Sequence, residues 1–145
     1  MAKVESFELD HDLVKAPYVR QAGYEVHQTG AIVTKFDLRF VQPNQDALPT
    51  GALHTLAHLL AINIRDYVDG VIDLSPMGCR TGFYMICWGE HTPEEIASAL
   101  EKVLQIVLET TVVPATIIPC SAHKNTRSKC WQPVSAATLS RAQSR

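Results

Sequence analysis

Two histidines, His54 and His58, stand four residues apart in a stretch rich in leucine and alanine. On a helix this spacing projects both imidazoles from one face, where they can bind one metal ion. A protease of the HExxH type would need glutamate where Thr55 stands, and the inverted motif would need it where Ala57 stands. The pattern therefore indicates either a metal site of another kind or two partly buried, hydrogen-bonded histidines.

A cysteine follows further along the chain, in the glycine-flanked run SPMGCRTG over residues 75–82. A thiol close to a cation ionises more readily than an isolated one, and the thiolate can move a proton or bind a metal. Arg80 is the cation next to Cys79 in the sequence. With the two histidines, Cys79 would make an open three-ligand site of the catalytic kind. The alternative is a structural thiol in a loop.

The first elements that must position these residues form a hairpin. Strand-like stretches over residues 24–28 and 31–40 flank Thr29-Gly30, which predicts a β-hairpin with a glycine-containing turn. In the second stretch charged residues alternate with apolar ones, so one face should cover the core while the other meets water or a functional pocket. The charged positions are Lys35, Asp37 and Arg39.

The histidines and the cysteine fall on the next elements. Apolar residues recur at helical spacing and predict a helix over residues 52–68, with both histidines along one side of its apolar stripe. The stripe is Leu53, Leu56, Leu60 and Ile64. Short strands are predicted over residues 71–74 and 83–88, so that Cys79 lies in the loop between them.

A second helix and the domain limits complete the expected organisation. The run Thr-Pro-Glu-Glu at residues 92–95 is typical of a helix start, and the apolar pattern continues to about Glu109. We therefore expect one α+β domain over residues 1–118, with an antiparallel β-sheet packed against helices. Residues 119–145 show no clear period, and we expect a divergent segment that is irregular or disordered.

Length and composition exclude several classes of protein. The 145 residues suit one domain, 46% of them are hydrophobic, and the formal net charge is −2, so neither disorder nor nucleic-acid binding is indicated. The one basic cluster, residues 124–129, is more typical of a solvated tail. The sequence shows no export signal and no membrane-spanning run. We therefore expect a cytoplasmic protein whose four cysteines are reduced, with neither membrane nor nucleic acid as a partner.

Five segments stand in the order and near the spacing of one known family. They are FELDH at residues 7–11, APYVR at 16–20, KFDLRF at 35–40, HTLxHL at 54–59 and DLSPMGCRTGFYM at 73–85. Together they closely resemble the S-ribosylhomocysteine lyases of the LuxS family, and the resemblance covers roughly residues 4–115. It implies a LuxS-like fold and a cytoplasmic homodimer with two metal sites at the subunit interface.

The resemblance also implies a reaction on a small-molecule substrate. S-ribosylhomocysteine is cleaved to homocysteine and 4,5-dihydroxy-2,3-pentanedione, the precursor of the quorum-sensing signal autoinducer-2. A carbonyl group moves along the ribose by enediolate steps before the thiol is eliminated, which requires a Lewis acid and groups that transfer protons. The metal that the resemblance implies is Fe²⁺, one per chain, with Zn²⁺ or Co²⁺ as substitutes.

By the same resemblance, His54 and His58 are metal ligands and Cys79 is the catalytic cysteine. Six further residues fall in motifs that the family uses around the substrate, and for each the alternative is an ordinary surface or salt-bridged residue. They are Ser6, His11, Lys35, Arg39, Arg65 and Asp73.

The chain departs from the family at two places that bear on function. Ala57 replaces the glutamate of the family's HTLEH motif, and a methyl group cannot accept a proton. We therefore expect metal and substrate binding with turnover reduced by roughly 10²–10⁴-fold. The family's third ligand lies in a Cys-Gly motif; here Cys120 stands near that position but precedes Ser121, and Cys130 follows later. The alternative to an impaired lyase is an inactive family member without stable metal binding.

A neighbouring reading frame offers an account of the divergent segment. With permitted codons, residues 119–140 can be re-read as VQRTQEHAKQVLAAGLSRDPF, a helix-like sequence that resembles the C-terminal helix of the family. We therefore predict a frameshift or a small deletion in the gene or in its sequencing record. An uninterrupted frame in the coding DNA would contradict this prediction.

Overall fold

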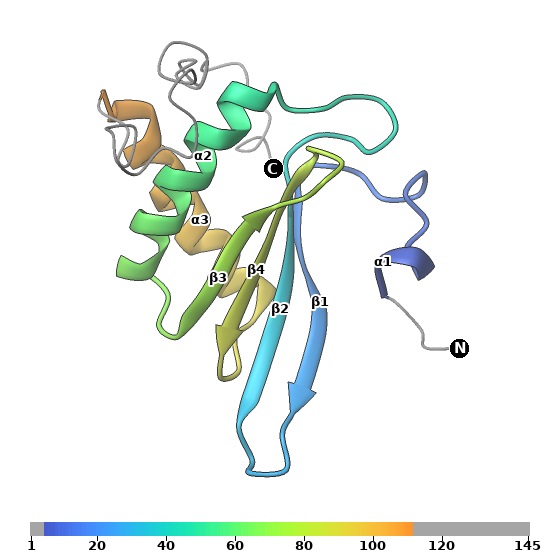
Figure 1. Ribbon diagram of the computed structural model, residues 1–145, viewed down its shortest axis with the longest axis vertical. Helices are drawn as coiled ribbons and strands as arrows, with labels where there is room; N and C mark the ends of the chain where they lie inside the picture. The colour runs from blue at the N-terminus through green and yellow to red at the C-terminus, as the bar shows by residue number, and fades with distance from the viewer. Residues whose placement is uncertain (1–4, 112–145) are drawn as a thin grey trace, which may run out of the picture.

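A four-stranded antiparallel sheet occupies the middle of the structure, and two helices cover one of its faces (Figure 1). The structure is a computed structural model and describes residues 5–111. The predictions about Cys120, Cys130 and residues 119–145 lie outside these residues.

The sheet has the strand order β1-β2-β4-β3, and every neighbouring pair is antiparallel. The strands are β1 (Tyr18–Val26), β2 (Ile32–Arg39), β3 (Val71–Pro76) and β4 (Gly82–Trp88). The helical elements are α1 (Glu5–Glu8), α2 (Thr50–Asn63), the 3₁₀ turn η1 (Ile64–Asp66) and α3 (Pro93–Glu109). The predicted α+β fold, with an antiparallel sheet packed against helices, is confirmed.

The predicted hairpin is present, but its first strand is longer than expected. β1 begins at Tyr18, directly after the proline, and pairs with β2 from Tyr18 opposite Arg39 to Val26 opposite Ile32. A bulge between Gln21 and Gly23 shifts the register. This bulge breaks the alternation of side chains, so the periodicity of the sequence does not show the first half of the strand.

The core lies between the sheet and the two helices. Alternate residues of β2 face the helices, and Phe36 and Leu38 are completely buried there. Phe40 packs edge-to-face on Phe83 of β4, with ring centroids 5.6 Å apart. Burial of such side chains contributes about 1.5–3 kcal/mol each. The predicted stripe on α2 is confirmed, since all of its members are buried: Leu53, Leu56, Leu60 and Ile64.

Local hydrogen bonds determine where α2 ends and where α3 begins. α2 gives way to η1 earlier than the predicted end at residue 68, because the backbone amide of Tyr67 bonds to Ile64 in a tighter turn. α3 begins as predicted, with a capping box between Thr92 and Glu95, and Pro93 at its first turn. Such a cap contributes about 1 kcal/mol. Within residues 5–111, no helix is long and apolar enough to cross a membrane.

Candidate active site

The rings of His54 and His58 converge on one side of α2. Their Nε2 atoms lie 3.0 Å apart, and the ring centroids are 4.6 Å apart. Two nitrogens bound to one tetrahedral ion at about 2.0–2.1 Å would be roughly 3.3 Å apart. Partial burial, with a further contribution from His54, lowers the pKa of His58, which favours the neutral ring that binds metals. The pair therefore fits one divalent ion.

No group of three or more His, Cys, Asp or Glu residues suited to a metal forms within residues 5–111. Cys79 therefore does not complete a three-ligand site with the histidines in the described part of the chain. Ala57, the residue before His58, is half-buried, and its methyl group packs against the core. Position 57 thus offers no titratable side chain beside His58.

Cys79 lies in the loop between β3 and β4, beside a hydroxyl group and a cation. Its Sγ is 3.0 Å from Thr81 Oγ1 and 3.9 Å from Arg39 Nη1. Burial raises the pKa of the Cys79 thiol, but the hydrogen bonds with Thr81 and the charge of Arg39 outweigh it and leave the pKa below its usual value. A larger fraction of Cys79 is therefore thiolate at neutral pH than for an ordinary cysteine.

The cation beside Cys79 is Arg39, and the sequence-based attribution to Arg80 is wrong. The β2–β4 register places Arg39 opposite Gly82, at the end of the cysteine loop. Arg80 has a left-handed backbone (φ 59°), and its Nη1 donates to Thr50 Oγ1 at 3.3 Å. That contact joins the cysteine loop to the first turn of α2, one turn before His54.

A buried carboxylate, Asp37, holds Arg39 in place. Arg39 Nε donates to Asp37 Oδ1 at 3.1 Å, and Nη2 donates to Oδ2 at 2.8 Å. The Tyr18 hydroxyl also donates to Oδ2, at 3.1 Å. Sequence reasoning missed Asp37, Tyr18 and Thr81 as site residues, although the charged face predicted for the strand contained Asp37.

Arg39 shares its face of the sheet with two other residues predicted to surround the substrate. Lys35 and Asp73 both pair with Ile86 in the register, so all three side chains project from the same face. Lys35 Nζ lies 4.0 Å from the centroid of the Tyr84 ring. Asp73 is exposed and accepts a hydrogen bond from the Ser75 hydroxyl.

The remaining predicted residues lie at the borders of this face or away from it. Ser6 is in α1, near the β1 side of the sheet (Figure 1). His11 is half-buried in the segment that follows α1, and its backbone carbonyl accepts a hydrogen bond from Gln42 at 3.5 Å. Arg65 is exposed on η1 and donates to the carbonyl of Ala61.

Within one chain, the histidine pair and the charged face belong to opposite sides of the sheet. α2 packs on the face that buries Phe36 and Leu38, whereas Lys35 and Arg39 alternate with those residues and point the other way. We call the side of the sheet that carries Lys35, Asp37 and Arg39 the open face, because α2 and α3 cover the other side (Figure 1).

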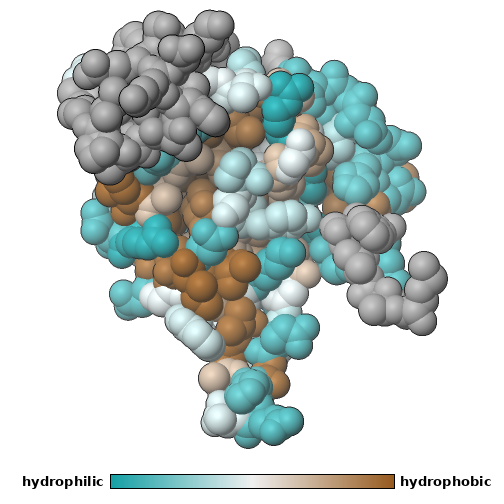
Figure 2. All heavy atoms as spheres, in the orientation of Figure 1, coloured by the Kyte–Doolittle hydropathy of each residue, from teal (hydrophilic) through white to brown (hydrophobic). Residues whose placement is uncertain are grey.

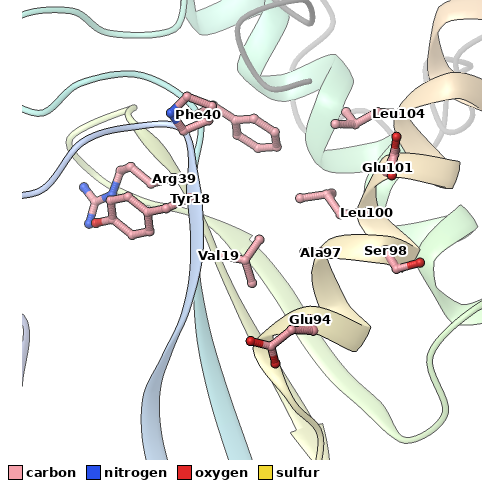
Figure 3. Close-up of a pocket in the computed structure, with 11 residues that line it drawn as sticks. Tyr18, Val19, Arg39, Phe40, Glu94, Ala97, Ser98, Leu100, Glu101 and Leu104 are labelled. Atoms are coloured by element: carbon pink, nitrogen blue, oxygen red, sulfur yellow. The ribbon is translucent and has the colours of Figure 1, made fainter. Parts of the chain in front are cut away.

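A cavity of about 440 Å³ lies between α3 and the nearby ends of β1 and β2 (Figure 3). Apolar side chains that line it include Val19, Phe40 and Leu104, and Glu94 and Glu101 are among its polar lining residues. Figure 3 shows the side chains of Tyr18 and Arg39 on the far side of the strands from α3. His54, His58 and Cys79 are not among the residues that line this cavity.

Comparison with known proteins gives one consistent family. A model of the S-ribosylhomocysteinase (LuxS) family matches residues 4–144. The S-ribosylhomocysteine lyase of Enterococcus faecalis is 69% identical over 116 residues, which cover 79% of this chain and 75% of that protein. The S-ribosylhomocysteine lyase of Streptococcus gordonii is 55% identical over 126 residues, 84% of this chain and 79% of that protein. A Streptococcus pneumoniae protein of the same name is 53% identical over the same coverage.

Proposed function

The chain belongs to the S-ribosylhomocysteinase (LuxS) family, and from that membership we propose that it acts as a carbon–sulfur lyase on S-ribosylhomocysteine. The products would be homocysteine and 4,5-dihydroxy-2,3-pentanedione, the autoinducer-2 precursor. The observation that carries the proposal is the convergence of the His54 and His58 Nε2 atoms to 3.0 Å. This geometry occurs in a chain 69% identical to an S-ribosylhomocysteine lyase.

His54 and His58 would hold one divalent ion per chain, with Cys120 as the third ligand. Imidazole nitrogen is a suitable donor for Fe²⁺, Zn²⁺ and Co²⁺, and Fe²⁺ is the ion that the family resemblance implies. Such an ion supplies Lewis-acid chemistry, polarising a carbonyl oxygen of the substrate.

Cys79 would transfer protons between adjacent carbons of the ribose. As a thiolate it takes a proton from one carbon, and as a thiol it returns a proton to the next. Arg39 supports the thiolate form, since its Nη1 lies 3.9 Å from the sulfur and carries a positive charge. Ala57 has no atom that can accept or donate a proton in these steps. We therefore propose slow turnover, roughly 10²–10⁴-fold below that of a family member with glutamate at this position.

The charges of the open face suit the amino-acid end of the substrate. Lys35 would bind its carboxylate, and Asp73 would bind its ammonium group, because they carry the complementary charges. Ser6, His11, Arg39 and Arg65 stay predictions as further substrate-binding residues. The cytoplasmic location also stays a prediction.

We propose that two chains form a homodimer through the open face. This face carries apolar surface: Val33 pairs with Trp88, which is 55% exposed. Figure 2 shows apolar atoms gathered over the lower parts of β3 and β4. Trp88→Glu should therefore lower the mass measured by sedimentation, whereas Ile62→Glu on α2, where Ile62 is 51% exposed, should not.

The experiment that tests the activity is homocysteine release from S-ribosylhomocysteine by the Fe²⁺- or Co²⁺-loaded full chain, without oxygen. We expect slow release that His58→Ala abolishes. The matched control is His27→Ala, which removes an exposed histidine of the β1–β2 turn and should leave the rate unchanged. Equal release by the His58→Ala and parent proteins would contradict the proposed function.

A further inference from the structure

Two groups around Arg39, the carboxylate of Asp37 and the hydroxyl of Thr81, have no role in the reaction proposed above. Asp37 is 0% exposed, and Arg39 and Thr81 are each 3% exposed. A carboxylate out of contact with water is costly unless charged partners and hydrogen bonds satisfy it. Arg39 and Thr81 contact Cys79, and Asp37 contacts Arg39, so these contacts bear on how the thiol is held.

Asp37 fixes the orientation of the Arg39 guanidinium. Both carboxylate oxygens accept from it, Oδ1 from Nε at 3.1 Å and Oδ2 from Nη2 at 2.8 Å. This two-point contact sets the plane of the guanidinium, which a single contact would leave free to turn. The Tyr18 hydroxyl holds the carboxylate in turn, at 3.1 Å from Oδ2. The remaining terminal nitrogen, Nη1, therefore points toward the cysteine loop.

The donor and the acceptor of the hydrogen bond between Arg39 Nη1 and Thr81 can be assigned. Arg39 Nη1 donates to Thr81 Oγ1 at 2.7 Å, and because a guanidinium has no acceptor, the hydroxyl oxygen must accept. The hydroxyl proton of Thr81 is then free to donate elsewhere. Cys79 Sγ lies 3.0 Å from the same oxygen, within reach of that proton, and 3.9 Å from Nη1 itself.

We propose that Asp37 and Thr81 are positioning residues for the thiol of Cys79. Asp37 holds the guanidinium of Arg39, and Arg39 orients the Thr81 hydroxyl so that its proton points at the sulfur. The importance of this arrangement for turnover rests on the proposed function, because there Cys79 transfers protons. The effect on the thiol itself does not depend on lyase activity.

Other charged and titratable groups surround this arrangement and enter any pH dependence. Arg20 of β1 lies 3.2 Å from Asp37 Oδ2 and also contacts Glu5 of α1. Tyr18 of β1 contacts Asp37, and Arg80 of the cysteine loop is turned toward Thr50. Arg39 is the cation in contact with the sulfur, so a change in its position should alter the ionisation of Cys79 most.

The test is the ionisation of Cys79 in the metal-free full chain, followed by the ultraviolet absorbance of the thiolate against pH. Subtraction of the Cys79→Ser protein removes the signal of the other cysteines. Thr81→Val removes the donor but keeps the shape, so we expect about tenfold less thiolate at neutral pH. Thr81→Ser restores a hydroxyl and should restore the midpoint pH of the Cys79 titration in the parent protein. Thr34→Val is the matched control, because Thr34 is also buried on the sheet but bonds to Gly89 instead.

Asp37→Asn separates positioning from a simple effect of charge. Loss of a nearby negative charge would by itself favour the thiolate and lower the midpoint. Loss of positioning releases Arg39 from the sulfur and raises the midpoint, which is the result we expect. A lower midpoint for Asp37→Asn, or an unchanged midpoint for Thr81→Val, would overturn the proposal. If the Asp37→Asn protein does not fold, the comparison of Thr81→Val with Thr81→Ser still tests the proposal. Failure of homocysteine release with a shifted midpoint would contradict only the proposed function.

Discussion

Replacement of Ala57 by glutamate should raise turnover more than any other single change in this chain. Residue 57 lies on α2, half-buried and directly before His58, so a longer side chain there starts beside the proposed metal ligands. A carboxylate at this point supplies the proton acceptor that a methyl group cannot. General acid–base catalysis contributes roughly 10²–10⁴-fold, which corresponds to about 2.7–5.5 kcal/mol of activation free energy.

The fold should tolerate this substitution. Glutamate is only slightly poorer than alanine as a helix former, by less than about 0.7 kcal/mol. Glutamate keeps the Cβ of alanine, so the contact of this atom with the core is retained. The propensity cost is small against a typical domain stability of about 5–15 kcal/mol. A gain in rate should therefore not be hidden by unfolding.

The assay is homocysteine release under single-turnover conditions, with metal content measured on the same samples. Ala57→Gln is the matched control, because glutamine has the length of glutamate but does not serve as a base. Ala61→Glu places the same charge one turn later, at another half-buried alanine of α2. If Ala57→Glu with a full metal complement is no faster than Ala57→Gln, the missing-base explanation is wrong.

Two further predictions follow from the cysteines and from the β2–β4 junction. At pH 7 iodoacetamide should modify Cys79 well before Cys87, because the pKa of Cys79 is lowered whereas burial raises that of Cys87 to about 11; peptide mass mapping checks the order, and equal rates would contradict it. Gly82→Ala should lower the free energy of unfolding by roughly 1–3 kcal/mol or more, since a Cβ there would lie 2.1 Å from the Leu38 carbonyl oxygen. Urea unfolding measures this loss, and Gly78→Ala, with open space around the added methyl group, should change little.

The sequence predicts those parts of the fold and site that depend on local spacing. The i, i+4 separation of His54 and His58 is sufficient to bring their rings together on a helix, and the Thr92 capping box forms as its residue types indicate. Contacts that depend on strand pairing cannot be predicted from local spacing. Arg39 reaches Cys79 because β2 pairs with β4, and no spacing in the chain shows that register. Arg80 is adjacent in sequence, yet the backbone conformation of the loop turns it toward Thr50.

The contribution of the C-terminal segment to function can be measured through metal content. Two imidazoles are one donor short of the three protein ligands that a catalytic ion usually has, and no third donor completes a group with them within residues 5–111. If Cys120 supplies that donor, the anaerobically purified full chain should hold about one transition-metal ion per chain.

Cys120→Ser should then weaken metal binding by at least roughly 10-fold, because even loss of a supporting contact to a ligand costs 10–100-fold in affinity. Cys130→Ser is the matched control and should retain the ion, while the reverse result would assign the ligand to Cys130. Retention of the ion by both variants would show that neither cysteine is required. A parent protein with almost no metal would place the main defect in residues 119–145, and glutamate at position 57 would then restore no activity. Metal content therefore has to be known before the rate of any position-57 variant is interpreted.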